Sequence, residues 1–305
     1  MALDKTELEM WWLRRRSVTR NEGRKQLMSA QREAWLDFSG KTCVVTGAGG
    51  GIGQEIATSF AVSGAKVVVL DHSRAGAEAT ERMILDLGGA AISIVADVTD
   101  TASIDRAVDQ TKETFGDCDI LVNNAGILRF GPLESIAPEI WDQTIAVNVK
   151  GYLLCAQRFG ECMRQRQSGT VVNVASIAAT EPHPYCGSYS VSKAAVIMLT
   201  QQLALEWGPS GVTVNAVSPG FIPTPLNTEF YAVPGVTEQR SKLVPLRSLG
   251  STRDVANSVM FLASNFARYV NGHNLVVDGG LSHTSMIHVP RPGYDNGGGL
   301  GGLAT

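Results

Sequence analysis

Residues 42–53 read TCVVTGAGGGIG, a β-branched run that leads directly into a glycine-rich turn. An amphipathic stretch at helical spacing follows, over residues 52–63. Glycines at 47, 51 and 53 let the backbone turn tightly and approach a pyrophosphate, and the start of the helix offers unpaired N–H groups to an anion. The segment therefore predicts a strand–turn–helix unit that binds a dinucleotide. Its glycine spacing departs from the strict GxGxxG pattern, and it lacks the Gly-Lys-Ser/Thr ending of a P-loop nucleotidase.

The rest of the chain repeats this alternation of strand-like and helix-like segments. Apolar, β-branched runs occur at residues 42–46, 66–70, 91–95, 120–122, 170–174, 213–217 and 274–277. Amphipathic stretches lie between them, for example at residues 52–63, 75–87, 101–115 and 141–166. Strands that alternate with helices predict an α/β fold, in which a parallel sheet carries helices on both faces. Nothing between residues 40 and 280 resembles a linker, so we expect a single domain.

The composition excludes several classes of protein. The chain has 305 residues, of which 44% are hydrophobic, and this is enough for a large core. A net charge of −3 gives no electrostatic basis for binding nucleic acid, and no apolar run reaches the length of about 18 residues that predicts a membrane span. The five cysteines form no CxxC pair, and the five histidines show no metal-ligand spacing. We therefore expect free thiols, a cytoplasmic protein and no bound metal.

Both ends of the chain differ from the part between them. Residues 1–37 contain Trp11-Trp12 followed by Arg14-Arg15-Arg16, but nearby acidic residues dilute the positive charge. This pattern predicts a surface extension rather than a targeting or membrane-surface segment, and Met28 is an alternative start of the protein. Residues 282–305 are rich in glycine and predict a tail that is flexible or packed on a partner. The predicted domain is residues 38–281.

Asp71 bears on which dinucleotide is bound. It directly follows the second strand-like run, 18 residues after Gly53. An acidic side chain at this place accepts hydrogen bonds from the adenosine ribose hydroxyls and repels a 2′-phosphate, which favours NAD over NADP. Arg74 is a signal in the opposite direction, because an arginine could pair with that phosphate. The structural alternative for Asp71 is a helix N-cap.

A second group of residues can move a proton at a carbonyl carbon. Tyr189 and Lys193 are four residues apart, so they share one face of a helix, and Ser176 ends the apolar run 171–175. A phenol has a reference pKa of about 10, and a nearby cation favours the phenolate and lowers that pKa. Tyr189 is therefore a candidate general acid/base. Taken singly, each residue also has a structural explanation: a strand cap, a half-buried aromatic and a solvated helix residue.

These residues, in this order, resemble the short-chain dehydrogenase/reductase family in its form of roughly 250 residues, marked by the motifs TGxxxGIG and YxxxK. The resemblance covers residues 38–281. A YxxxK motif is common by chance, but an ordered set of motifs is not. The set comprises TGAGGGIG at residues 46–53, Asp97, Asn123-Asn124-Ala125-Gly126, Asn148, Ser176, Tyr189 with Lys193, and Pro219-Gly220.

The resemblance implies a doubly wound Rossmann fold with a sheet of seven parallel strands. It implies a catalytic set in which Tyr189 is the general acid/base and Ser176 binds the substrate oxygen. Lys193 tunes Tyr189 and holds the nicotinamide ribose, and Asn148 holds a water of a proton relay. The implied cofactor-binding residues are Gly47, Gly51, Ile52, Gly53, Asp71, Asp97, Val98, Asn124, Ala125, Gly126, Tyr189, Lys193, Pro219, Gly220, Ile222 and Thr224. Asp97 could equally cap a loop, and Asn124 with Gly126 could simply form a turn.

The expected function is the interconversion of a secondary alcohol and a ketone with NAD(H), on a small polar or cyclic substrate. Residues 128–130, 181–186 and 221–247 are expected to line the substrate pocket, the last of them as a mobile lid. The family resemblance also implies a homo-oligomer, dimer or tetramer, built on the helices that carry Asn148 and Tyr189 and on the last strand. The alternatives are a 3-oxoacyl-thioester reductase that uses NADPH, a non-catalytic nucleotide-binding scaffold, and a peripheral membrane enzyme anchored through Trp11 and Trp12.

Overall fold

The structure is a computed structural model that describes residues 36–285. Most of the predicted N-terminal extension and of the glycine-rich tail lies outside these residues, as do Trp11, Trp12 and Met28. The domain boundaries at 37 and 281 therefore stay predictions. From Phe38 onward, the described residues belong to one compact unit. Within them, no helix is both long and apolar enough to cross a membrane.

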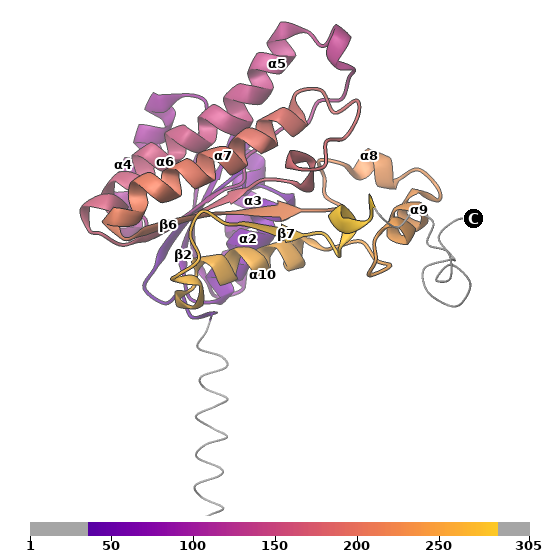
Figure 1. Cartoon of the computed structure of the whole chain (residues 1–305). Coiled ribbons are helices and arrows are strands. Elements are labelled where there is room, and N and C mark those ends of the chain that lie inside the picture. Colours follow the sequence, from indigo (N-terminus) through magenta and orange to yellow (C-terminus); the bar gives the residue numbers. More distant parts are fainter. Residues whose placement is uncertain (1–35, 286–305) are drawn as a thin grey trace, which may run out of the picture. The chain divides into compact units, whose positions relative to one another are not determined.

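A sheet of seven parallel strands forms the centre of this unit (Figure 1), which confirms the predicted fold class. The strand order is β3-β2-β1-β4-β5-β6-β7. The strands β1 and β7 have the bounds that the apolar runs predict, and the other five differ by one or two residues at an end. The bounds are Thr42–Thr46 (β1), Lys66–Asp71 (β2), Ala90–Val95 (β3), Ile120–Asn123 (β4), Gly169–Val174 (β5), Val212–Pro219 (β6) and Asn274–Val277 (β7).

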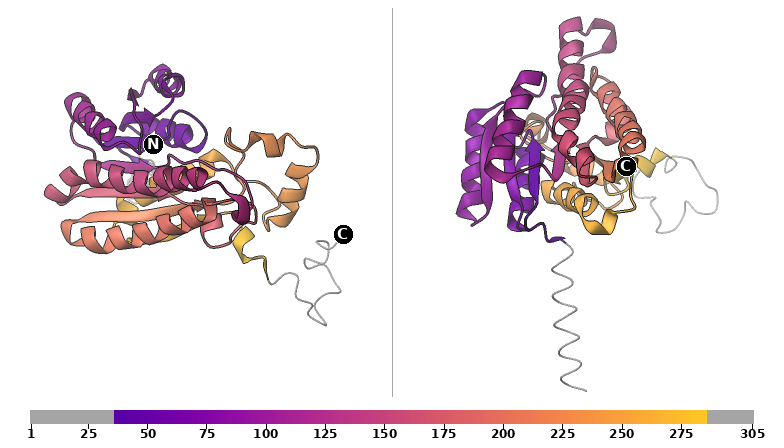
Figure 2. Two further views of the ribbon diagram at one scale, coloured as in Figure 1. Left: turned by 90° about the horizontal axis from the view of Figure 1, so that it is seen from above. Right: turned by 90° about the vertical axis from the view of Figure 1, so that its left-hand side faces the viewer.

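Helices cover both faces of the sheet (Figure 2). One face carries α2, α3 and α10, and the other carries α4, α6 and α7. Two shorter helices, α8 and α9, lie beyond one end of the sheet (Figure 1). The bounds are Gly51–Val62 (α2), Arg74–Asp86 (α3), Thr101–Phe115 (α4), Pro138–Ile145 (α5), Gly151–Gln165 (α6), Tyr189–Trp207 (α7), Thr228–Tyr231 (α8), Val236–Leu243 (α9) and Thr252–Ala263 (α10).

The central strands are apolar on both sides because helices bury both sides. Every residue of β1 is buried, and so is every residue of β2 after its first. This is the pattern of a parallel sheet in a two-faced α/β fold. On the α4, α6 and α7 side, the core is filled by Phe159, Met163 and Leu203 among others. The hydrophobic runs in the sequence are thus the strands of one doubly wound sheet.

The strand order places two loops side by side. β1 pairs with β2 on one side and with β4 on the other, so Val45 lies opposite both Val69 and Val122. The chain therefore winds away from β1 in one direction and returns at β4 to continue in the other. Ligands bind at such a switch point, outside the carboxyl ends of the strands. The glycine-rich turn after β1 and the segment after β4 meet there.

One expectation about local structure needs correction. The predicted helix at 141–166 is three segments: α5, a π-helical turn at Ala146–Lys150, and α6. A π turn has no hydrophobic signature of its own, and such turns are frequent at functional sites. The segment 221–247, expected to be a mobile lid, contains α8 and α9, which are too short to show a helical period. Its role as a lid stays a prediction.

The close packing of the glycine-rich turn can be tested by substitution. A Cβ on Gly53 would overlap the carbonyl oxygen of Gly47 and the side chain of Asn124. We expect Gly53→Ala to lower the free energy of unfolding by about 1–3 kcal/mol or more, because backbone atoms have to move to admit the methyl group. Gly50→Ala is the matched control, since Gly50 has an extended φ of −178° and nothing within 4 Å of an added Cβ. Urea unfolding measures both variants, and equal losses would show that the turn is not packed as described.

Candidate active site

The glycine-rich turn is fixed to the segment after β4 by hydrogen bonds. The side chain of Asn124 donates to the carbonyl oxygens of Thr46 and Gly47, each at 3.0 Å. The hydroxyl of Thr46 accepts from the backbone N–H groups of Asn124 at 3.0 Å and Ala125 at 3.1 Å. Gly47 has a φ of +64°, and a Cβ there would stand 2.7 Å from the Ala125 backbone. Asn124 therefore does more than form a turn: it holds the loop in place.

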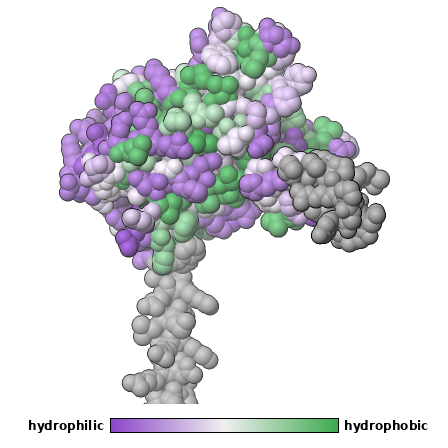
Figure 3. Space-filling model, in the orientation of Figure 1, coloured by the Kyte–Doolittle hydropathy of each residue, from purple (hydrophilic) through white to green (hydrophobic). Residues whose placement is uncertain are grey.

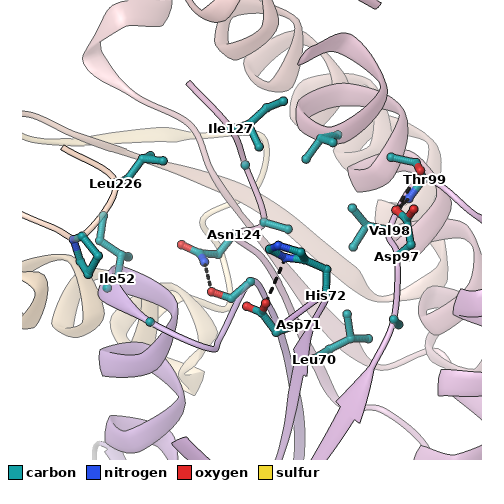
Figure 4. A pocket seen from close by; sticks show the side chains of 18 of the residues that line it. Ile52, Leu70, Asp71, His72, Asp97, Val98, Thr99, Asn124, Ile127 and Leu226 are labelled. Carbon is teal, nitrogen blue, oxygen red and sulfur yellow. Dashed lines mark hydrogen bonds and ion pairs between the residues drawn. The ribbon is translucent and has the colours of Figure 1, made fainter. Parts of the chain in front are cut away.

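A cavity of about 680 Å³ lies above this loop. Figure 4 shows it between the ends of β1, β2 and β3 and the segment that carries Asn124 and Ile127. It is large enough for part of a dinucleotide, and the bare backbone of the loop forms its floor. This cavity is lined by ten of the predicted cofactor residues: Gly47, Gly51, Ile52, Asp71, Asp97, Val98, Asn124, Ala125, Gly126 and Thr224. The residues present therefore fit a nicotinamide dinucleotide.

Asp71 lies at the end of β2 with its carboxylate almost fully buried, at 7% exposure. One oxygen accepts from the Gly49 N–H at 2.8 Å, and the other accepts from the Ser73 N–H at 2.8 Å. The N-cap of α3 is Ser73, whose hydroxyl accepts from Gly76 N–H, so Asp71 is not the cap. His72 lies beside it, with Nδ1 3.1 Å from an Asp71 oxygen (Figure 4). Arg74 pairs with Glu78 at 3.6 Å.

Asp97 is a loop-forming residue that also faces the cavity. Its Oδ1 accepts from the backbone N–H and the hydroxyl of Thr99, both at 2.8 Å (Figure 4). The structure thus shows the loop-capping role that the sequence left open. It also places Val98 and Thr99 on the cavity wall. Capping the loop and lining the cavity are compatible roles for Asp97, because the loop that its side chain stabilises forms part of the cavity wall.

A second cavity, of about 140 Å³, adjoins the first, since five residues line both: Ile52, Asn124, Gly126, Thr224 and Leu226. It brings together three of the predicted catalytic residues, Ser176, Tyr189 and Lys193. Pro219, Gly220 and Ile222 line it too. The two predicted residues that line neither cavity are Gly53, which packs under the loop, and Asn148.

Burial governs the acidity of Tyr189, which begins α7. Burial raises the pKa of the phenol, a hydrogen bond with Ser176 lowers it and Cys186 raises it, and the net result is a pKa of about 12. Ser176 also accepts from the Ala178 N–H at 3.1 Å, which caps the short turn after β5. The groups of the chain alone therefore do not lower the Tyr189 pKa in the way that the sequence leads us to expect.

The ammonium of Lys193 makes its direct contacts elsewhere. Its Nζ donates to the carbonyl of Val174 at 2.7 Å and to the hydroxyl of Tyr152 at 3.3 Å, and it lies 5.8 Å from the centre of the Tyr189 ring. Burial lowers the pKa of Lys193 to about 7. Lys193 thus shares a helix face with Tyr189, as predicted, but its hydrogen bonds fix it to β5 and to α6.

Asn148 is fully buried in the π turn, and both amide atoms of its side chain form hydrogen bonds. The amide oxygen accepts from the Ile127 N–H at 2.8 Å, and the amide nitrogen donates to the Ile127 carbonyl at 3.0 Å and to the Ser192 hydroxyl at 3.0 Å. Ser192 in turn donates to the Tyr189 carbonyl at 2.7 Å. This network links the segment after β4 to the start of α7. A water held by Asn148 stays a prediction.

Sequence analysis gave no role to three residues that hold the site together: Thr46, which it quoted only as the start of a motif, Tyr152 and Ser192. Tyr152 is four residues after Asn148, and Ser192 is three residues after Tyr189, so helical spacing could have found both. Thr46 ends β1 immediately before the loop, where a hydroxyl has backbone groups within reach. All five cysteines are free thiols. Within residues 36–285, no group of His, Cys, Asp or Glu side chains is arranged to hold a metal ion.

Comparisons with known proteins agree with this geometry. A sequence model of the family described as enoyl-(acyl carrier protein) reductase matches residues 47–282. The chain is 38% identical to 3β-hydroxysteroid dehydrogenase 1 of Eggerthella lenta, over 81% of this chain and 95% of that one. It is 37% identical to D-threitol dehydrogenase of Mycolicibacterium smegmatis, over 84% and 99%.

The solved structures include a gluconate 5-dehydrogenase from Burkholderia cenocepacia in complex with NADP and tartrate. It superposes with a TM-score of 0.79 at 32% identity, and the match covers 83% of this chain and 99% of that one. Together with the ordered motifs and the two adjoining cavities, these matches identify an oxidoreductase that uses a nicotinamide cofactor. The chain belongs to the short-chain dehydrogenase/reductase family, in its form of about 250 residues, and is of the alcohol dehydrogenase/ketoreductase type.

Proposed function

We propose that the protein interconverts a secondary alcohol and a ketone with NAD(H), and that Tyr189 is the general acid/base. The observation that carries the proposal is the meeting of Ser176, Tyr189 and Lys193 in a small cavity that adjoins the dinucleotide cavity. A volume of about 140 Å³ favours a small reacting group. A non-catalytic scaffold would have no need for all three side chains in one cavity.

In the oxidative direction, the Tyr189 phenolate accepts the hydroxyl proton of the substrate. Ser176 donates a hydrogen bond to the same substrate oxygen, which positions the alcohol and stabilises its developing charge. Lys193, anchored to Val174 and Tyr152, keeps a positive group beside the phenol and offers its ammonium to a ribose hydroxyl. A nicotinamide bound in this cavity supplies the hydride chemistry. In the reductive direction, Tyr189 returns the proton.

Asn148 acts as a positioning residue in this proposal. It fixes the backbone of Ile127, which lines the dinucleotide cavity, and through Ser192 it fixes the first turn of α7. This buried amide lies in the π turn at Ala146–Lys150, and such turns are frequent at functional sites. The same amide is the candidate holder of the relay water.

The arrangement at the end of β2 favours NAD. The buried carboxylate of Asp71 is positioned to accept hydrogen bonds from ribose hydroxyls and would repel a 2′-phosphate. Arg74, the residue that could have paired with that phosphate, forms an ion pair with Glu78 instead and does not line the cavity. The Burkholderia relative was solved with NADP, so the comparison does not support the choice of NAD, which rests on Asp71. NADPH-dependent reduction of a 3-oxoacyl thioester is the second candidate, and Asp71 counts against it.

An exposed apolar stripe on α7 supports a homo-oligomer. Val191, Met198 and Leu205 are 46%, 62% and 80% exposed and recur every seven residues, so they share one face of the helix. Figure 3 shows hydrophobic residues among hydrophilic ones on the face where α6 and α7 lie in Figure 1. Such stripes mark protein interfaces. We therefore propose a dimer or tetramer built on this face. The five free thiols fit the proposed cytoplasmic location.

The proposed chemistry is tested by Tyr189→Phe, which removes the hydroxyl and keeps the ring. Turnover of any alcohol that the protein oxidises should fall by about 10²- to 10⁴-fold, while NADH binding, followed by its fluorescence, stays unchanged. Tyr269→Phe is the control, because that tyrosine is 94% exposed. Normal turnover in Tyr189→Phe would exclude the mechanism.

The proposed cofactor preference is tested by Asp71→Ala. The wild-type protein should use NAD with a kcat/KM at least about tenfold above that for NADP, and the variant should lose most of this ratio, because hydrogen bonds to a charged group contribute about 1.5–3 kcal/mol. Asp97→Ala removes another carboxylate from the same cavity and should leave the ratio unchanged. A wild-type preference for NADP would contradict the role given to Asp71.

The proposed interface is tested by the double variant Met198→Glu and Leu205→Glu. Two charges on the apolar stripe should reduce the mass measured by light scattering from an oligomer to a smaller species. Leu87→Glu is the control, since Leu87 is 60% exposed but lies at the end of α3. A wild-type monomer, or a double variant of unchanged mass, would refute this interface.

A further inference from the structure

One arginine near the catalytic cavity is surrounded by aromatic rings. Arg240 lies on α9, and its guanidinium carbon is 4.8 Å from the centre of the Tyr231 ring, 5.0 Å from Phe221 and 5.8 Å from Phe230. The three rings come from α8 and from the segment that joins β6 to α8. A guanidinium can contact aromatic rings and still donate hydrogen bonds from its N–H groups.

Those N–H groups are unused. Among the described residues, Arg240 forms no ion pair within 4.0 Å and no hydrogen bond, although its side chain is partly buried. A guanidinium that loses water without gaining a partner is destabilising. Its five donors form a planar fork that matches a carboxylate. Burial and the charge of Arg240 lower the pKa of the His183 imidazole, and Glu181 opposes them. Among the described residues, no ion pair joins Glu181 to Arg240.

A second unused donor lies next to the first. The hydroxyl of Tyr231 is buried and has no hydrogen-bond partner among residues 36–285, and its ring is the nearest of the three to the Arg240 guanidinium. Buried hydroxyls are nearly always hydrogen-bonded, so an exception calls for a missing partner. The Arg240 guanidinium and the Tyr231 hydroxyl therefore both lack a hydrogen-bond acceptor.

This pair of donors adjoins the wall of the catalytic cavity. Phe221 lies between Gly220 and Ile222, both of which line that cavity. The ring of His183 is 6.5 Å from the Phe221 ring, and the charge of Arg240 acts on His183, which precedes Tyr189 on the same loop. An anion held by Arg240 would therefore belong to a molecule whose other end reaches Tyr189.

We propose that Arg240, assisted by Tyr231, binds a carboxylate of the substrate, at a position remote from the carbon that is oxidised or reduced. The substrate is then a hydroxy acid or the corresponding keto acid. This inference deepens the proposed function and rests on it. The competing explanation is that Arg240 only ties α9 to α8 and Phe221 as a structural contact.

Matched substrates separate these explanations. We would measure kcat/KM for D-gluconate and for D-glucitol, which carries a hydroxymethyl group in place of the carboxylate, with NAD and the full-length protein. The wild-type protein should prefer gluconate, and Arg240→Met should reduce kcat/KM for gluconate by about 10- to 100-fold, because it removes hydrogen bonds to a charged group. Glucitol should change by less than about twofold. Tyr231→Phe should act in the same direction, more weakly.

The control variant lies on α9, the helix that also carries Arg240. Lys242→Met removes an exposed cation from α9 and should leave both substrates unaffected. Equal losses for gluconate and glucitol in Arg240→Met would identify a structural contact and overturn the proposal. No loss for gluconate, or a wild-type preference for glucitol, would overturn it as well.

A binding measurement keeps the proposal testable when neither polyol is turned over. Tartrate should raise the melting temperature of the wild-type complex with NADH more than it raises that of Arg240→Met, with sulfate as the ionic-strength control. Equal shifts would overturn the carboxylate site. A protein that binds tartrate through Arg240 but oxidises no alcohol would refute the proposed function and leave this site in place.

Discussion

The close packing of the glycine-rich turn against the segment after β4 is the contact on which the site depends. A Cβ on Gly53 would overlap the Gly47 carbonyl oxygen, and a Cβ on Gly47 would overlap the Ala125 backbone. Asn124 and Thr46 form hydrogen bonds between the two segments. This contact lies at the switch point of the sheet, where β1 and β4 are neighbours. It exposes the loop backbone to the larger cavity, and it fixes the segment that leads to Ile127.

From Ile127, a chain of hydrogen bonds leads to the helix that carries the catalytic residues. Asn148 binds both backbone groups of Ile127 and reaches Ser192, which holds the first turn of α7. Tyr189 and Lys193 therefore have positions set by the loop segment as well as by their own helix. Lys193 is buried and Tyr189 is partly buried. This burial raises the pKa of Tyr189 to about 12 and lowers that of Lys193 to about 7. The chain alone favours the uncharged form of the phenol, so the phenolate needs a charge that arrives with the ligands.

Much of this could be predicted from the sequence, for physical reasons. Buried parallel strands have to be continuous apolar runs, so all seven were recognised. Motif order then indicated the family, and most of the site residues predicted from it line one of the two cavities. The π turn could not be predicted, because it replaces one helical hydrogen-bond register by another without changing the hydrophobic period. The surroundings of Lys193 were also missed: Val174 contributes only a backbone carbonyl, which no side-chain pattern reveals. The pairing of Arg240 with three rings depends on how α8 and α9 fold over the site, and the sequence gives no period for such short helices.

The central claim is that Tyr189 carries the proton, and its ionisation tests this most directly. We would follow tyrosinate absorbance against pH for the wild-type protein and for Tyr189→Phe, with and without NAD. In the chain alone, the two titrations should coincide below about pH 10, the ordinary pKa of a phenol, because burial keeps Tyr189 protonated. With NAD bound, the wild-type protein should show one additional ionisation at lower pH, since a positive nicotinamide ring favours the phenolate. Titrations that coincide in both states would contradict the account.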